Sequence, residues 1–312
     1  MKRMFMISLV LLIALSGMVY GGGSQESDTK TIGFSVYDMQ YGFFQQMEAG
    51  TKAGIQALGY DYVLHDEKSD EALMVSGSQD LINQGIAALI ISPCKPMALG
   101  PIVEAAHAKG IPVIVDDIGG GNSNYDVIVI SDNFGGGEMA GEYVLDQLKG
   151  SSGSKEVAII KCEPSAVFAV RRGEGFKKVV TAAGYTVVKE LSGHSKPEEG
   201  YQIMKDIITA NPKVQAVFAE NDPMAAAAAQ AAVDAGRTDI LIVGFNADMV
   251  ALEAIQAGTL AATIQQVPYE MGKMTADLAD KLIKGEALKF DDAANREIYV
   301  PVNLITKDNV QK

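Results

Sequence analysis

The sequence predicts an α/β protein built from two related lobes, each formed around a parallel β-sheet. Short runs of β-branched and apolar residues alternate with amphipathic helical patterns from Thr31 onward, which is typical of βαβ units. The predicted strands lack polar alternation, as expected for parallel strands that are buried on both faces. The pattern then restarts near the middle of the chain. At about 150 residues per domain, the 312 residues leave room for two such lobes.

The first half of the chain alternates strands with helices. We expect strands at Thr31–Tyr37, Asp61–His65, Ala87–Ser92, Pro112–Asp116 and Val127–Ser131. We expect helices at Gly42–Leu58, Glu71–Gln84, Ala98–Lys109 and Gly136–Leu148. Glycines directly follow the first and third of these helices, at Gly59 and Gly110, where a helix C-terminus favours them.

The second half repeats this order, with strands expected at Glu156–Lys161, Thr186–Glu190, Ala216–Glu220 and Ile240–Gly244. At a constant offset of 125 residues, Phe43 corresponds to Phe168 and Ala57–Tyr60 corresponds to Ala182–Tyr185. This self-similarity predicts a duplicated lobe, although chance matches among glycines could produce part of it.

The N-terminus has the pattern of an export signal. Lys2 and Arg3 precede the apolar run Phe5–Leu15, and small residues follow at Gly21–Gly23. The run is shorter than the ~20 residues that span a bilayer, so we expect a cleaved signal peptide over residues 1–23, with an uncleaved membrane anchor as the alternative. Residues 24–30 are expected to be a flexible lead-in, and no Cys follows the apolar run as a lipoprotein would require.

Composition and charge exclude several classes of protein. With 26 Lys and Arg against 39 Asp and Glu, the formal charge is −13, so the basic surface that a nucleic-acid partner needs is missing. The 2 cysteines, Cys94 and Cys162, cannot build a disulfide scaffold. Export would permit a disulfide between them, but it would lock the two lobes together and is not favoured.

No motif for catalysis or metal binding is present. None of the three histidines, His65, His107 and His194, has HExxH or paired metal-ligand spacing, and neither a G-x-S-x-G motif nor a P-loop occurs. The run Gly135–Gly141 follows a strand, but its GxGxxxG spacing differs from that of a dinucleotide-binding loop, so we interpret it as a glycine-rich helix entry. We therefore expect no enzyme activity, no cofactor, no metal site and no catalytic residue.

Ligands of open parallel sheets bind beyond the carboxyl ends of the strands, so two facing lobes predict one site in the cleft between them. The strand-end residues of the first half are Tyr37, Asp38, Gln40, Tyr41, Phe43, Phe44, Ser92, Pro93, Cys94, Asp116, Asp117 and Ile118. Those of the second half are Cys162, Glu163, Glu220, Asn221, Asp222, Phe245, Asn246, Asp248, Gln265 and Gln266. Aromatic faces beside carboxylates and amides suit the C–H patches and vicinal hydroxyls of a polyhydroxylated ligand.

Each candidate also has a purely structural interpretation. The pair Phe43–Phe44 opens a helix and could belong to the core, and Asp117 could belong to a turn or a helix cap. Either residue of Asn221–Asp222 could cap the Ala-rich helix that follows. The pair Arg171–Arg172 lies on a predicted helix face and could carry only surface charge.

In combination, several stretches resemble the ribose/galactose-type periplasmic sugar-binding proteins, the exported receptors of sugar ABC importers. The resemblance runs from about Thr31 to Asn309. The stretches that carry it are Gly42–Phe44, Ile111–Asp117, Ser131–Asn133 with Gly135–Gly136, Arg172–Phe176, Val214–Asp222, Val243–Asn246 and Leu260–Gln266.

The resemblance implies a type I periplasmic binding protein fold, with two Rossmann-like lobes, a three-stranded hinge and a ligand cleft between the lobes. The chain would cross between lobes near Ser131–Asp132, Gln266–Val267 and Pro301–Leu304. The N-terminal lobe would then comprise residues 31–131 and 267–300, and the C-terminal lobe residues 132–266 and 301–312. We expect a periplasmic monomer that closes around a carbohydrate and signals to the membrane permease of an ABC importer.

By position, the resemblance makes Phe43 and Phe44 the aromatic wall of the cleft and Asp117 the carboxylate that binds sugar hydroxyls. Asn221 would be the cleft asparagine and Gln266 the amide on the hinge side. The remaining candidates for contact with the ligand are Gln40, Tyr41, Ile118, Arg171, Arg172 and Asn246.

Four positions depart from the family pattern. Ile118 stands where the family usually has an Arg, and Val170 where a second pocket Arg would align, although Arg171 is next to it and a shift of one residue is possible. Asn246 replaces the usual Asp, and Ser195 the usual aromatic residue. These changes put an ordinary ribose or glucose pocket in doubt and favour a smaller or more apolar polyol, a deoxy sugar or another modified sugar.

Other classes of protein share parts of this pattern. The effector domain of a sugar-responsive repressor has the same fold, but it should follow a helix-turn-helix, and an export signal occupies that place. A sugar dehydrogenase or isomerase needs a base, metal or cofactor motif that the sequence lacks. A chemotaxis or quorum-signal receptor of the same fold remains an alternative to a transport receptor.

Overall fold

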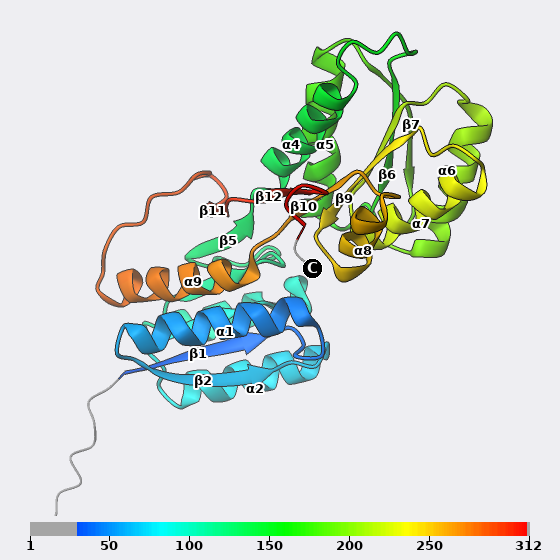
Figure 1. Ribbon diagram of the computed structural model, residues 1–312. Coiled ribbons are helices and arrows are strands. Elements are labelled where there is room, and N and C mark those ends of the chain that lie inside the picture. The colour runs from blue at the N-terminus through cyan, green and yellow to red at the C-terminus, as the bar shows by residue number, and fades with distance from the viewer. Residues whose placement is uncertain (1–29, 311–312) are drawn as a thin grey trace, which may run out of the picture.

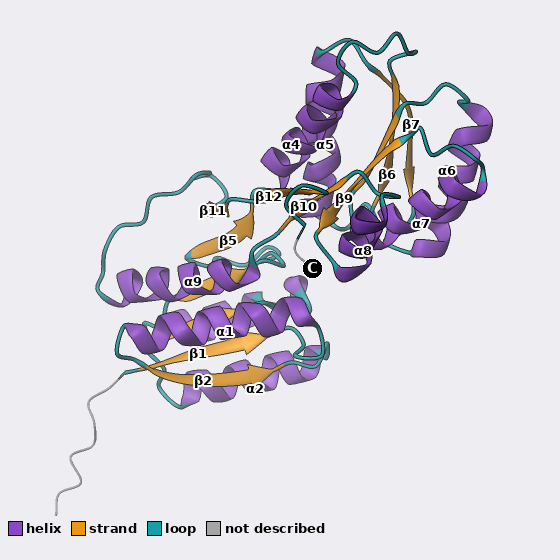
Figure 2. Ribbon diagram, viewed as in Figure 1, coloured by secondary structure: helices purple, strands orange, loops and turns teal. Residues whose placement is uncertain are grey.

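The computed structural model describes residues 30–310, so the predicted signal peptide and most of the lead-in lie outside the described residues. Within this range the chain forms two lobes, each with a six-stranded sheet between layers of helices (Figure 1, Figure 2). The predicted α/β class with two parallel-sheet lobes is therefore confirmed. No helix in this part of the chain has the length and apolarity needed to cross a bilayer.

The first lobe has an all-parallel sheet with strand order β11-β5-β4-β3-β1-β2. Its strands are β1 (Thr31–Val36), β2 (Asp61–Asp66), β3 (Ala88–Ile91), β4 (Val113–Asp116), β5 (Val127–Ser131) and β11 (Glu297–Val300). One face of the sheet is covered by α1 (Gly42–Ala57) and α9 (Pro268–Ile283), which run side by side (Figure 1). The other face is covered by α2 (Glu71–Asn83) and α3 (Gly100–His107).

The second lobe repeats the plan with strand order β12-β10-β9-β8-β6-β7, in which β12 is antiparallel to β10. Its strands are β6 (Glu156–Lys161), β7 (Thr186–Ser192), β8 (Ala216–Ala219), β9 (Leu241–Asn246), β10 (Ala262–Gln265) and β12 (Asn303–Thr306). One face carries α4 (Asn133–Gln147) and α5 (Val167–Ala182). The other carries α6 (Pro197–Ala210), α7 (Asp222–Asp234) and α8 (Met249–Ala257).

Over residues 30–310 the chain passes between the lobes three times. The first crossing runs from β5 to α4, the second from β10 to α9, and the third from β11 to β12. Because β11 pairs with β5 and β12 pairs with β10, the crossings lie next to one another at the edges of the two sheets. They form the hinge region.

The glycine-rich segment after β5 lies inside a helix. We predicted a helix start at Gly136, whereas α4 begins at Asn133. The reason is a side-chain cap, because Asp132 Oδ1 accepts the Gly135 N–H at 2.8 Å and so satisfies a free donor of the first turn.

Glycines also set how closely paired helices approach in both lobes. A Cβ added to Gly137 on α4 would collide with the carbonyl oxygen of Arg172 on α5. A Cβ added to Gly50 on α1 would collide with the carbonyl oxygen of Tyr269 on α9. The glycine run singled out in the sequence therefore has a packing role, which agrees with its interpretation as a helix entry.

Candidate ligand-binding cleft

Asp117 follows the carboxyl end of β4, in a strained turn. It adopts φ +67°, and the next residue, Ile118, donates its N–H to the Asp116 carbonyl at 2.9 Å, the i to i+2 bond of a γ-turn. Burial raises the pKa of Asp117 to about 6, and the Arg172 guanidinium of the second lobe opposes that rise. The Asp117 carboxyl group of the first lobe is thus influenced by the charge of Arg172 in the second.

Apolar side chains form the rest of this wall. Phe44 is 8% exposed and stacks on Tyr37 with ring centroids 5.0 Å apart, so it supports the wall from within the core. Phe43 meets Phe44 edge to face at 5.2 Å and stays partly exposed. Ile118 is also partly exposed and packs against the same cluster. The first lobe thus presents an apolar surface next to the Asp117 carboxyl group.

The loop between β1 and α1 holds two further candidates. Gln40 folds back on Asp38, donating its side-chain amide to Oδ2 at 2.7 Å and its backbone N–H to Oδ1 at 2.9 Å. Ser69 Oγ donates to the same Oδ2 at 2.6 Å, and these hydrogen bonds lower the pKa of Asp38. Tyr41 is 49% exposed. Gln40 therefore stabilises the loop, while Tyr41 lies at the surface.

In the second lobe, Arg172 of α5 is held by oxygen acceptors. Its Nε donates to Asn133 Oδ1 at 2.8 Å, and its Nη1 donates to the Glu220 carbonyl at 2.8 Å and to Asn246 Oδ1 at 3.2 Å. The guanidinium carbon lies 4.0 Å from the Phe245 ring centroid, a cation–π distance. Burial lowers the pKa of Arg172 from its usual value. Neutral acceptors and a ring face thus fix the orientation of this charge.

Hydrogen bonds extend from Arg172 to the hinge in a closed ring. Gln266 Nε2 donates to Asn246 Oδ1 at 2.8 Å, and Gln266 Oε1 accepts from Ser131 Oγ at 2.7 Å. Asn133 Nδ2 donates to the Ser131 carbonyl at 2.9 Å. Asn133 Oδ1 accepts from Arg172 Nε, which closes the ring. Because Ser131 and Gln266 lie at two of the crossings, this polar ring links the second-lobe wall to the hinge.

Asn221 follows β8 and caps α7. Its Oδ1 accepts the Met224 N–H at 3.0 Å, and its Nδ2 lies 3.6 Å from Cys162 Sγ, so the capping interpretation is confirmed for Asn221. The preceding Glu220 is fully buried, and its Oε2 accepts the Cys162 N–H at 2.7 Å. Its Oε1 has no hydrogen-bond partner among the described residues.

Carboxyl groups with raised pKa values line the strand ends of both lobes. Burial raises the pKa of Glu220 to about 7 and that of Asp222 to about 7. Burial also raises the pKa of Asp116 well above its usual value, and neither of its oxygens has a partner in the part of the chain that the structure describes. Near neutral pH such groups can donate as well as accept hydrogen bonds, and all three are fully buried. No cluster of His, Cys, Asp and Glu within residues 30–310 could hold a metal ion.

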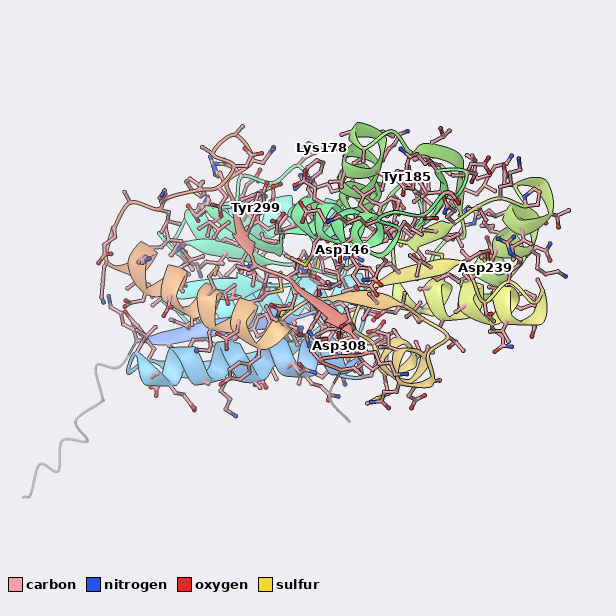
Figure 3. All side chains as sticks on the ribbon, turned by 45° about the horizontal axis from the view of Figure 1, so that its top comes forward. Asp146, Lys178, Tyr185, Asp239, Tyr299 and Asp308 are labelled. Atoms are coloured by element: carbon pink, nitrogen blue, oxygen red, sulfur yellow. The ribbon has the colours of Figure 1, made fainter. Side chains whose placement is uncertain are left out.

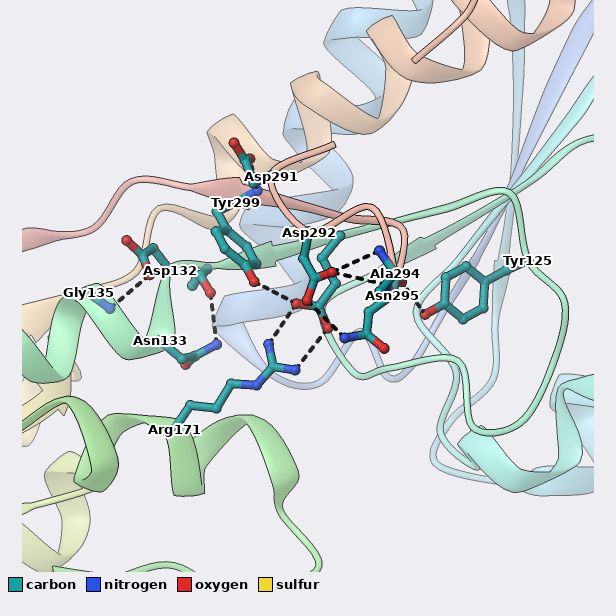
Figure 4. Close-up of polar contacts among 12 residues, drawn as sticks. Tyr125, Asp132, Asn133, Gly135, Arg171, Asp291, Asp292, Ala294, Asn295 and Tyr299 are labelled. Atoms are coloured by element: carbon teal, nitrogen blue, oxygen red, sulfur yellow. Dashed lines mark hydrogen bonds and ion pairs between the residues drawn. The ribbon is translucent and has the colours of Figure 1, made fainter. Parts of the chain in front are cut away.

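Arg171 is engaged by the opposite lobe (Figure 4). Its Nη1 donates to Glu297 Oε2 at 2.7 Å, and its Nη2 donates to Glu297 Oε1 at 2.9 Å. Glu297 belongs to β11 of the first lobe, so this pair bridges the lobes. The structure therefore gives Arg171 a bridging contact and places the neighbouring Arg172 among the polar side chains beside the hinge.

The two cysteines are free. Burial raises the pKa of the Cys94 thiol to about 12 and that of the Cys162 thiol to about 11. Each lobe also uses a buried carboxylate to bind a cysteine N–H at 2.7 Å, Glu67 in the first and Glu220 in the second. These cysteines therefore have structural surroundings and are not poised as reactive thiolates.

Three residues of this region were not among our predicted site residues: Ser131, Asn133 and Glu297. The first two lie in a stretch that carries the family resemblance, so a signal for them was present in the sequence. Glu297 lies in no motif, and its partner Arg171 is 126 residues away along the chain. Only the folded chain brings that pair together.

Two α/β lobes joined by three adjacent crossings, with polar strand-end residues beside them, define the class of two-lobed binding proteins. The chain belongs to the periplasmic binding protein domain family, whose model matches residues 32–287. The resemblance that the sequence motifs indicated is thereby confirmed.

Individual relatives give the same result. The chain is 32% identical over 277 residues to the ribose import binding protein RbsB of Bacillus subtilis, covering 89% of this chain and 87% of that protein. It is 31% identical to the xylitol-binding protein of Mycolicibacterium smegmatis, covering 96% of this chain and 83% of the relative. The crystal structure of a periplasmic ribose ABC transporter protein from Conexibacter woesei matches with a TM-score of 0.83 at 27% identity, covering 90% of this chain and 93% of that one.

Proposed function

We propose that this protein is an exported, non-enzymatic solute-binding protein that captures a sugar or sugar-like polyol between its lobes and delivers it to an ABC importer. The observation that carries the proposal is the polar ring of Arg172, Asn246, Gln266, Ser131 and Asn133 beside the hinge, whose Arg172 charge acts on the Asp117 carboxyl group of the first lobe. Family membership supports it, as do relatives named for ribose and xylitol.

Each wall has a distinct task in this mechanism. The exposed part of Phe43 and the side chain of Ile118 receive a C–H face of the ligand, and Asp117 accepts hydrogen bonds from adjacent hydroxyls. On the opposite side, Asn221 and Asn246 supply amide donors and acceptors. Gln266, Tyr41 and Phe44 complete the site as the hinge amide, a rim residue and a support for the apolar wall.

The ligand we propose is uncharged and carries an apolar edge. Nε and Nη1 of Arg172 already donate to three protein oxygens, so only Nη2 is left to donate to a ligand. The buried carboxyl groups at the strand ends are neutral or negative near pH 7, so they supply no positive charge to balance an anion. Ile118 next to Phe43 favours a methyl or methylene group over a hydroxyl at one end of the ligand.

Binding is coupled to closure of the lobes about the three crossings, as in hinge-type domain closure. We propose lobe boundaries at residues 31–131 with 267–300 and 132–266 with 301–312, which the sheet membership of the strands supports. The closed form of a periplasmic monomer would then present both lobes to the membrane permease.

Mass spectrometry of small molecules released from the purified protein by unfolding is the direct test. A calorimetric screen of the refolded protein against D-ribose, xylitol, other pentoses and hexoses, polyols and deoxy sugars should then give a match. Absence of binding across this panel after unfolding and refolding would contradict the proposal. Chemical conversion of a bound sugar would instead indicate that the protein is an enzyme.

A further inference from the structure

Two side chains from the first turns of α5, Phe168 and Arg171, contact the first lobe. Phe168 packs against a core cluster of the first lobe, where a Cβ added to Gly119 would lie 2.9 Å from its ring. Arg171, one turn further on, pairs with Glu297. The Arg171 guanidinium carbon lies 4.9 Å from the centroid of the Phe168 ring, so the two side chains act as one contact.

The first lobe holds the Glu297 side chain ready for this pairing. Its carboxylate accepts the Tyr299 hydroxyl at 2.8 Å in addition to both arms of Arg171. The Glu297 side chain is 4% exposed and that of Arg171 is 26% exposed. A bidentate pair with one buried partner is much stronger than an ordinary surface ion pair, because solvent screens it less.

The Arg171–Glu297 contact lies at the edge of a cavity. The cavity has a volume of about 290 Å³ and is lined by Asp132, Phe134 and Glu174 of the second lobe and by Asp292 and Tyr299 of the first. The cavity leaves room beside the contact, so Phe168 and the Arg171–Glu297 pair join the lobes at its edge. A small contact beside a hinge can form and break as the lobes rotate.

We propose that Phe168, Arg171 and Glu297 form an interlobe latch that holds the lobes in the binding-competent arrangement and so sets ligand affinity and residence time. The proposal rests on the proposed function. Arg172 follows Arg171 on the same helix, so the latch keeps the polar ring opposite Asp117. Apparent affinity scales with the fraction of molecules in the competent arrangement, so losing the latch weakens binding without removing a ligand contact.

The first test needs no ligand. Small-angle X-ray scattering of the purified protein should give a larger radius of gyration for Arg171→Ala and Glu297→Gln than for the wild type. Raising NaCl to 1 M should enlarge the wild type only slightly, because the half-buried pair is screened less than a surface pair, and should leave Arg171→Ala unchanged. The matched control is Lys178→Ala, which removes an ion pair to Glu138 at 2.6 Å that joins α5 to α4 within the second lobe (Figure 3 shows Lys178 on α5 and Tyr299 on β11).

The second test uses D-ribose and xylitol as probes. For a probe that binds, Arg171→Ala should raise the dissociation rate about tenfold, with a smaller change in the association rate. The charge swap Arg171→Glu with Glu297→Arg should restore most of the affinity and the wild-type radius, which a purely structural role would not predict.

An unchanged radius and a dissociation rate within about twofold of wild type for both single variants would overturn the latch, as would equal effects in Lys178→Ala. Thermal unfolding of each variant shows whether it is folded. Arg171→Ala leaves the buried Glu297 carboxylate without its partner and could destabilise the protein for that reason alone. Glu297→Gln removes the ion pair without leaving a buried charge, so it still tests the latch. If no polyol binds at all, the proposed function fails while the scattering experiment still decides whether the latch exists.

Discussion

The two lobes share one plan of packing and present opposite chemistry to the cleft. The first lobe contributes Phe43 and Ile118 beside the Asp117 carboxyl group, whereas the second contributes a hydrogen-bonded ring around Arg172. The sheet interiors are apolar in both, because buried parallel strands leave little choice. The comparison shows that one scaffold can carry two different sets of strand-end side chains, since the residues after the strand ends are less constrained by packing.

The largest effect is expected on the first-lobe side, from Asp117→Ala. Removing the carboxyl group eliminates charge-assisted hydrogen bonds to ligand hydroxyls and should weaken affinity about 100-fold. Stability should hold, because burial already disfavours the charged form of Asp117. Titration calorimetry measures the affinity, with exposed Asp146→Ala on α4 as the control. Undiminished affinity in Asp117→Ala would remove this residue from the site.

The second prediction compares the helix pairs of the two lobes. Gly50→Ala and Gly137→Ala each place a methyl group against a backbone carbonyl, so each should lower the free energy of unfolding by about 2–3 kcal/mol. Gly42→Ala is the control, because nothing lies within 4 Å of its added Cβ. Urea denaturation followed by circular dichroism gives the values. A loss in only one lobe's variant would show that the two helix pairs are not equivalent.

The third prediction concerns the buried Glu220 of the second lobe. Its pKa is raised to about 7 from the usual 4.5, so the folded state keeps a proton that the unfolded state loses above pH 4.5. The stability from this proton is complete below pH 4.5 and is lost as pH rises through 7.

Glu220→Gln mimics the protonated form and should abolish this dependence. Relative to wild type, the variant should gain about 3 kcal/mol of stability between pH 4 and 8. Urea denaturation at several pH values measures the difference between the two proteins, which cancels the other titrating groups. Parallel pH profiles for variant and wild type would mean that Glu220 is ionised in the fold.

The smallest effect is expected for selectivity at Ile118. In Ile118→Asn the apolar edge of the first-lobe wall becomes polar, so binding of a deoxy sugar should weaken about fivefold relative to its hydroxylated parent. Calorimetry with 2-deoxy-D-ribose and D-ribose gives the ratio, and Met97→Ala, at a side chain that is 67% exposed, is the control. A ratio that does not change would place the apolar edge of the ligand elsewhere.

Local signals predicted much of the molecule. The apolar runs located the strands, and Asn221 was recognised as a possible helix cap because it precedes an Ala-rich helical segment. Such features depend on neighbours in the sequence, so the sequence contains the information needed to infer them.

The neighbours Arg171 and Arg172 show where local signals end. Successive residues of a helix point about 100° apart, so Arg171 reaches the opposite lobe and Arg172 reaches Asn246 within its own lobe. Nothing in the sequence Arg171–Arg172 tells which is which, because the answer depends on how α5 is rotated against α4.

The sequence by itself determined the α/β class, the duplicated lobes and the strand ends at which a site could form. The tertiary structure alone decided which side chains meet there. Ser131 and Gln266 are 135 residues apart, and Arg171 and Glu297 are 126 apart, yet each pair is hydrogen-bonded. Contacts over such separations exist only after both sheets and all three crossings have formed, so no local pattern encodes them.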